Sequence, residues 1–101
     1  MLKHIVFWRL KDQAEGATRA ENAAQIKLRL EALRGKIPGL LKLEVGLDVE
    51  RSPAAYDLAL YSEFTDQAAL DGYQKHPEHA AVAAFIGKVR SERVLVDYLV
   101  G

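Results

Sequence analysis

The fold follows from one segment near the start of the chain, Lys3-His4-Ile5-Val6-Phe7-Trp8-Arg9-Leu10. Successive side chains of a β-strand point to opposite faces of its sheet. One face of this strand would carry His4, Val6, Trp8 and Leu10, and the other would carry Ile5, Phe7 and Arg9. Both sets are mostly apolar, so we predict a central strand that is covered on both faces.

The next two elements downstream predict a helix and a hairpin. Thr18-Arg19-Ala20-Glu21 has the form of a capping box, and apolar residues at helical spacing follow it as far as Gly35. Residues 41–49 then alternate between apolar and polar side chains, as a half-exposed strand does. The connection to the next strand, 56–64, is too short for a crossover helix, so these two strands should be antiparallel.

The last third of the chain predicts a broken helix and a final strand. Asp66 can cap a helix that Pro77 interrupts and that restarts through Val89. Residues 93–100 are rich in β-branched side chains and form the last strand. The order is βαββαβ, which predicts an α+β, ferredoxin-like fold: a four-stranded antiparallel sheet with the helices on one face.

Length and composition limit the classes of protein. The 101 residues predict a single domain, 1–101, and half of them are apolar, as in globular proteins. Fourteen basic and fourteen acidic residues give a net charge of zero, so we expect no nucleic acid and no anionic membrane as partner. The chain has no cysteine, which excludes disulfides and thiolate metal sites. We expect no signal peptide, no membrane span and a cytoplasmic location.

The face of the sheet without helices should be apolar enough to need a partner, and a homodimer is the expected answer. Four charged residues, Arg9, Glu63, Arg93 and Asp97, would share this face. We predict ion pairs among them, for instance Arg9 with Asp97, although they can also be solvated residues of the rim. The apolar residues expected here are Ile5, Phe7, Ala59, Tyr61, Leu95 and Leu99.

The segment 73–79, Tyr-Gln-Lys-His-Pro-Glu-His, is the richest in chemistry. His79 could accept a proton near neutral pH, and Tyr73 could donate a hydrogen bond to a developing oxyanion. Three alternatives remain open: Tyr73 as an ordinary core tyrosine, His79 as a brace of the restarted helix, and His4 as a satisfied core histidine. His76 fits a helix-terminal residue rather than a catalyst.

Other kinds of site have weak support. His4, His76, His79 and Glu78 could in principle converge on a metal ion, but the spacing does not match that of zinc-binding helices, and we predict no metal site. The sequence has no glycine-rich phosphate loop, dinucleotide fingerprint or Gly-x-Ser-x-Gly elbow, so we expect no nucleotide cofactor. The hypothesis of a haem-handling barrel protein is supported only by Trp8 and a histidine in the pocket.

Three segments together resemble the stress-responsive A/B barrel domain (Dabb) family of the dimeric α+β barrel group. They are residues 3–11, the pattern Tyr73-x-x-His76-Pro77-x-His79, and Val94-Leu95-Val96-Asp97-Tyr98. The resemblance implies a homodimer whose two sheets form a dimeric α/β barrel, and it extends to olivetolic acid cyclase-like members. It implies a pocket between sheet and helices with His79 as general base, Tyr73 orienting a carbonyl oxygen and His4 in the wall.

The predicted function is therefore cofactor-independent acid–base chemistry of the polyketide cyclase or isomerase kind on a small hydrophobic carbonyl or aromatic ligand. The alternative is a non-catalytic, stress-associated or ligand-binding homodimer. A cavity of roughly 300 Å³ or more would favour a ligand site over a closed core. The residues expected to line the pocket beside Tyr73 and His79 are His4, Val6, Trp8, Ile26, Leu30 and Leu60.

Overall fold

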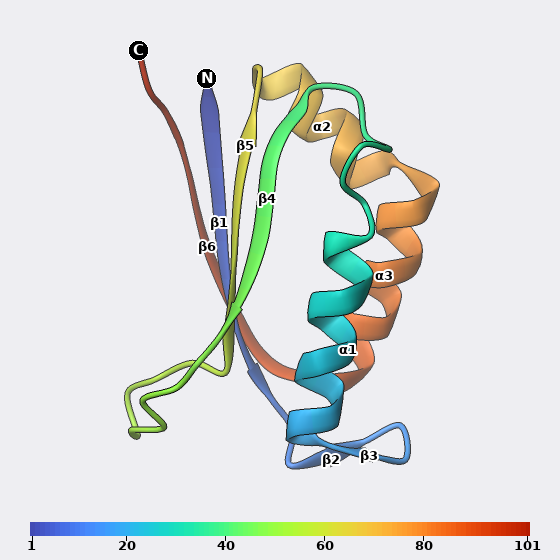
Figure 1. Ribbon diagram of the computed structural model, residues 1–101, viewed down its shortest axis with the longest axis vertical. Coiled ribbons are helices and arrows are strands. Elements are labelled where there is room, and N and C mark those ends of the chain that lie inside the picture. The colour runs from blue at the N-terminus through green and yellow to red at the C-terminus, as the bar shows by residue number, and fades with distance from the viewer.

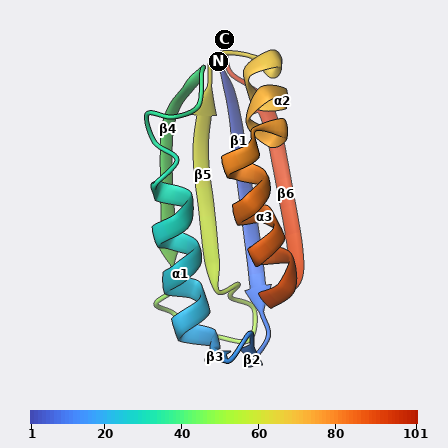
Figure 2. The ribbon, with the colours of Figure 1, turned by 90° about the vertical axis from the view of Figure 1, so that its right-hand side faces the viewer.

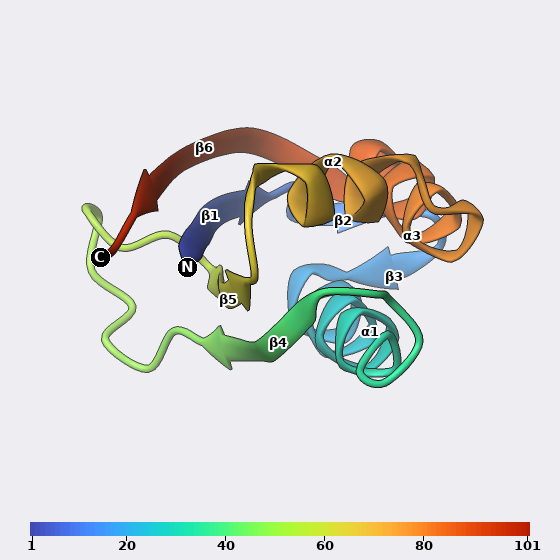
Figure 3. The same cartoon turned by 90° about the horizontal axis from the view of Figure 1, so that it is seen from above.

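The computed structural model describes residues 1–101 as a four-stranded antiparallel sheet covered on one face by three helices, with a small two-stranded sheet at one end (Figures 1 and 3). None of the helices is both long and apolar enough to span a membrane. The strands are β1 (Leu2–Leu10), β2 (Gln13–Ala14), β3 (Ala17–Thr18), β4 (Leu40–Leu47), β5 (Leu58–Phe64) and β6 (Arg90–Leu99). The helices are α1 (Arg19–Glu31), α2 (Gln67–Lys75) and α3 (Pro77–Val89).

The predicted ferredoxin-like fold is confirmed. The sheet has the order β4-β5-β1-β6, and every neighbouring pair is antiparallel. β1 occupies an inner position, where Val6 lies opposite Leu60 of β5 on one side and Leu95 of β6 on the other. α1 and α3 lie side by side over one face of the sheet, and α2 lies beyond the start of α3 (Figure 2).

Local signals start the helices where the sequence predicts. The capping box is formed: the Thr18 hydroxyl accepts a hydrogen bond from the Glu21 amide, and the Glu21 carboxylate accepts one from the Thr18 amide. Asp66 caps α2 by accepting from the Ala69 amide at 2.9 Å. His76 ends α2 and also begins α3, because its Nδ1 accepts from the Glu78 amide at 3.2 Å. Pro77 is the first residue of α3, where it costs no hydrogen bond.

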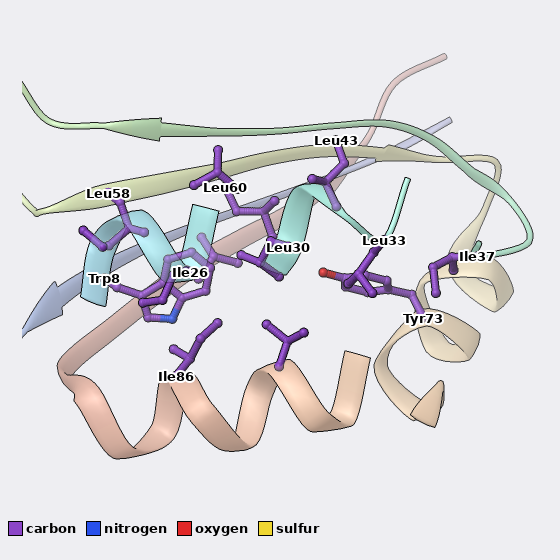
Figure 4. Close-up of a cluster of buried hydrophobic side chains, with 14 of the residues drawn as sticks. Trp8, Ile26, Leu30, Leu33, Ile37, Leu43, Leu58, Leu60, Tyr73 and Ile86 are labelled. Atoms are coloured by element: carbon purple, nitrogen blue, oxygen red, sulfur yellow. The ribbon is translucent and has the colours of Figure 1, made fainter. Parts of the chain in front are cut away.

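The core fills the layer between the sheet and the helices (Figure 4). Val6 and Trp8 of β1 meet Ile26 and Leu30 of α1 in this layer, and all four are buried. This burial is the main contribution to the stability of such a fold, at about 25 cal/mol per Å² of apolar surface removed from water.

Some boundaries differ from the prediction. The strand expected over 93–100 begins at Arg90, directly after α3, and the strand expected over 56–64 begins at Leu58. The short hairpin of β2 and β3 was not predicted, because two-residue strands leave no periodicity to detect. Its turn contains Glu15 and Gly16, both with positive φ.

The facing of β6 corrects the prediction for the uncovered side of the sheet. Residues directly opposite one another in an antiparallel pair point to the same face. Asp97 is opposite His4 and Leu95 is opposite Val6, so both lie on the helix side of the sheet. By the same register Arg93 and Leu99 also lie there, and the uncovered face carries Val94, Val96 and Tyr98 instead. The prediction was wrong because this strand is apolar on both faces and gives no alternation.

The predicted ion pair between Arg9 and Asp97 is wrong for the same reason. The two side chains belong to opposite faces of the sheet. Arg9 pairs with Glu92, with 3.1 Å between Nε and Oε2, whereas Asp97 accepts from His4. The uncovered face keeps the expected apolar character: Phe7 is 38% exposed and Val96 is 49% exposed.

Candidate functional site

A cavity of about 220 Å³ lies between the sheet and the helices. It is several times larger than the space of one water molecule, about 30 Å³, but it falls short of the roughly 300 Å³ expected of a ligand site. It is therefore more than a packing defect. Its walls are His4, Val6, Trp8, Leu30, Leu60, Tyr73, His79, Ala83, Ile86, Gly87, Arg90 and Arg93.

Two regular elements supply most of the wall. Alternate residues of β1, namely His4, Val6 and Trp8, project toward the helices and form the floor. From α3 the lining residues recur at helical spacing, at positions 79, 83, 86, 87 and 90. The break at Pro77 starts α3 in a new direction and so turns this stripe toward the sheet.

Tyr73 and His79 meet at one end of the cavity. Tyr73 is fully buried, and Figure 4 shows it extending from α2 into the layer of side chains under the helices. Its ring centroid is 4.2 Å from that of His79, with 46° between the ring planes. The Tyr73 hydroxyl and His79 Nδ1 are both buried without a hydrogen-bond partner in the protein. Such orphaned atoms are rare, because each costs free energy, and they are therefore candidates for contact with a ligand.

Burial sets the protonation states of the pair. It raises the pKa of the Tyr73 hydroxyl far above its usual range, although the charge of Arg93 opposes the rise. Burial also lowers the pKa of His79; the nearby backbone of Gln74 opposes this shift, and the charge of Arg93 reinforces it. At neutral pH the pair is therefore a neutral phenol, able to donate, beside a neutral imidazole, able to accept a proton.

His4, in the floor of the cavity, is firmly held. Its Nδ1 lies 2.5 Å from Oδ1 of Asp97, and its backbone carbonyl accepts from the Ser62 hydroxyl at 2.8 Å. A carboxylate can only accept, so Nδ1 is the nitrogen that donates in this bond. The His4 and Tyr73 rings are 6.3 Å apart in an edge-on arrangement.

The structure brings most of the predicted site residues together. Ile26 is the exception: it is completely buried in the core and does not line the cavity. His76 lies outside the cavity as a helix cap. No three His, Asp or Glu side chains are grouped as metal ligands would be. The predicted residues that line the cavity are His4, Val6, Trp8, Leu30, Leu60, Tyr73 and His79.

Sequence reasoning missed five residues of the wall. Ala83 and Gly87 leave room for the cavity, and a Cβ added at Gly87 would meet nothing within 4 Å. Counting at helical spacing from His79 finds both of them. The same spacing also finds Ile86 and Arg90, whereas Arg93 was assigned to the wrong face of β6.

These features define a small ferredoxin-like α+β protein with a cavity under its helices, and the comparison with known families agrees with this fold. The model of the Stress responsive A/B Barrel Domain (Dabb) family matches residues 2–100. The chain belongs to this family.

Similar proteins support the same fold. An uncharacterized protein of Streptomyces coelicolor, SCO4036, is 32% identical over 99 residues, which are 97% of this chain and 98% of the other. A dimeric ferredoxin-like protein of unknown function from Bacteroides fragilis is 35% identical, with a TM-score of 0.81 over 96% of this chain and 93% of that one. A dimeric ferredoxin-like protein of unknown function from Thermobifida fusca is 26% identical, with a TM-score of 0.84 over 98% and 90%. Dimeric relatives support the dimer that the uncovered face predicts.

Proposed function

We propose that the cavity carries out acid–base chemistry on a small carbonyl compound, with His79 as the general base and Tyr73 as the hydrogen-bond donor to the carbonyl oxygen. The observation that carries this proposal is the pair of orphaned polar atoms, the Tyr73 hydroxyl and His79 Nδ1, on adjacent rings in one cavity. A purely structural pair would be expected to have its hydrogen bonds made.

The reaction needs no cofactor. Neutral His79 takes a proton from the carbon next to the carbonyl group, and the electron pair of the broken C–H bond forms the enolate. Tyr73 donates its hydrogen bond to the oxygen on which the negative charge develops. Return of the proton from His79 to another carbon completes an isomerisation. Attack of the enolate on a second carbonyl of the same molecule, followed by protonation of the new alkoxide, completes an aldol cyclisation of the polyketide type.

The size of the cavity limits the substrate. An apolar cavity of about 150 Å³ holds one benzene ring. The 220 Å³ found here therefore suits a molecule of one ring with a short side chain. Val6, Leu30 and Leu60 supply an apolar wall for that ring. A longer chain would have to extend past the mouth of the cavity.

Deuterium exchange at the methyl group of acetophenone tests the proton-transfer step without knowledge of the natural substrate. Wild-type protein in D₂O should accelerate the exchange, followed by NMR, above the buffer rate. His79→Ala should lose that acceleration by about a hundredfold or more, the usual contribution of a general base. Tyr73→Phe should lose at least tenfold, because the oxyanion loses its donor. The rate should fall in acid, as His79 becomes protonated.

The matched control is His76→Asn, which removes a neighbouring imidazole outside the cavity and keeps a capping side chain. It should exchange acetophenone at the wild-type rate. Exchange that survives in His79→Ala, or that never exceeds the buffer rate in the wild type, contradicts the proposal. In the second case the non-catalytic, ligand-binding alternative takes its place.

A further inference from the structure

Two arginines stand at the cavity without an anionic partner. Arg90 and Arg93 both line it, and neither side chain forms an ion pair or hydrogen bond within the protein. The wall contains no aspartate or glutamate, so the cavity carries two uncompensated positive charges in a chain of net charge zero.

The other five arginines of the chain show that this is not a general feature of its surface. Each of them has a partner within the protein. Arg9 pairs with Glu92, Arg19 with Asp12 and Asp57, Arg34 with Glu31 and Arg51 with Asp57, while Arg29 lies over the Phe85 ring at 4.0 Å. The two arginines that lack a partner are therefore the two at the cavity.

The positions of the two residues explain how they would act together. Arg90 is the last of the lining positions that begin at His79 on α3, and it is also the first residue of β6. Arg93 follows three residues later and lies opposite Trp8, on the helix side of the sheet. Both residues are exposed, so they stand at the mouth and the apolar wall lies behind them.

We propose that the ligand of this cavity is a small organic carboxylate, with its carboxylate bound by Arg90 and Arg93 at the mouth and its apolar body inside. Arginine presents its N–H groups in a planar fork that matches a carboxylate. The inference deepens the proposed function, on which it rests for the reactive carbonyl. A keto acid with one ring or a short chain then places its carbonyl group at Tyr73 and His79.

Charge at Arg93 reaches the reactive pair, which supports this arrangement. Arg93 lines the same cavity as Tyr73 and His79, and its positive charge lowers the pKa of both of these side chains. A carboxylate bound at Arg93 therefore shares the cavity with the reactive pair. It would also neutralise the positive charge that opposes protonation of His79, and so help this residue to accept a proton.

Benzoate and benzamide test the inference, because they have nearly the same shape and differ in charge. Trp8 is the only tryptophan and lines the cavity, so its fluorescence reports binding, with calorimetry as a second measurement. Wild-type protein should bind benzoate at least tenfold more tightly than benzamide, and the preference should shrink as salt is added. Inorganic phosphate, which has no apolar body, should bind more weakly than benzoate.

The variants assign the preference to the two arginines. Arg90→Gln and Arg93→Gln should each reduce the benzoate preference severalfold, and the double variant should abolish it while benzamide binding stays the same. Lys75→Gln removes the same charge from a residue outside the cavity and should keep the preference. Both arginines are exposed, so the variants should fold, which circular dichroism checks.

Four outcomes overturn the inference: equal binding of benzoate and benzamide, binding of neither, phosphate binding as tight as that of benzoate, or a preference that survives in the double variant. The test is separate from that of the proposed function, because His79→Ala and Tyr73→Phe should keep the benzoate preference. If the protein prefers benzoate but does not accelerate the exchange of acetophenone, the carboxylate-binding site stands and the proposed catalysis is wrong.

Discussion

Two sets of buried polar groups in the layer between sheet and helices, those around Asp57 and those of the cavity, are treated in opposite ways. Near the β2–β3 hairpin, Asp57 accepts from the Leu10 amide at 2.7 Å, and Arg19 and Arg51 lie 3.5 and 3.8 Å from its carboxylate. Asn22 donates to the Ala14 carbonyl at 3.0 Å. Both of these buried side chains have their partners.

At the cavity, by contrast, three buried polar atoms have no hydrogen-bond partner in the protein. The three buried side-chain atoms without a partner belong to Trp8, Tyr73 and His79, and all three residues line the cavity. The difference teaches that this sequence can satisfy buried polar groups, and does so away from the cavity. Groups held at a cost to stability are typical of functional sites.

The largest expected effect on stability is at Asp57, whose carboxylate has its partners. Asp57→Ala should lower the free energy of unfolding by about 3 kcal/mol, because it leaves the buried Leu10 amide without its acceptor and removes the carboxylate that lies near Arg19 and Arg51. Urea unfolding measures the change. Asp12→Ala removes the exposed partner of Arg19 and should lower the free energy of unfolding by less than about 0.5 kcal/mol. If Asp57→Ala and Asp12→Ala lost equal stability, the buried carboxylate would contribute no more than the exposed one.

A smaller loss of stability is expected at Ser62, another buried polar side chain that has its hydrogen bond. Ser62 is fully buried and donates to the His4 carbonyl at 2.8 Å. Ser62→Ala should lower the free energy of unfolding by about 1 kcal/mol, the usual net contribution of such a bond. A neutral result in urea unfolding would show that this hydrogen bond adds nothing.

The orphaned hydroxyl should behave in the opposite way. Tyr73→Phe removes a buried group without a protein partner, so the free energy of unfolding should stay the same or rise by up to about 1 kcal/mol. The same urea titration, run beside Ser62→Ala, makes the comparison direct. A loss of 1 kcal/mol or more would mean that the hydroxyl serves the fold, and would favour Tyr73 as an ordinary core residue.

The smallest effect is a dependence of stability on pH. Because the pKa of His79 is lower in the folded protein than the usual 6.5, the unfolded chain binds its proton first as the pH falls. The contribution of His79 is complete above pH 6.5 and is lost as the pH falls through the lower, folded value. His79→Gln should therefore lose less stability than the wild type between pH 7.5 and 5. His76→Asn should follow the wild type; if it matched His79→Gln instead, the assignment to His79 would be wrong.

The parts of the fold that depend on local signals could be predicted from the sequence. The capping box at Thr18, the cap at Asp66 and the break at Pro77 each act within a few residues, and all are confirmed. The facing of β6 could not be predicted, because it depends on pairing with β1, which lies at the other end of the chain. Arg93 was misplaced with it, and the positive charge of the cavity was missed.

The cavity itself was only partly predictable. Side chains with chemistry, such as Tyr73 and His79, stand out in a sequence, and the structure places them together. The space around them exists because Ala83 and Gly87 have small side chains or none. A small residue in a helix does not by itself indicate a cavity. Ile26 was expected in the wall because it shares a helix face with Leu30, yet it packs fully into the core.

The inner position of β1 has a consequence for how the chain folds. Both of its neighbours, β5 and β6, come from the second half of the chain, and Leu2 is paired with Phe64 and with Leu99. β1 leaves the ribosome before both of its partners, so its second edge is covered only when β6 has been made. Contacts so distant in sequence slow folding, since a long loop must close before they form. A nascent chain of this protein would expose an apolar strand throughout its synthesis, when early aggregation is the main hazard.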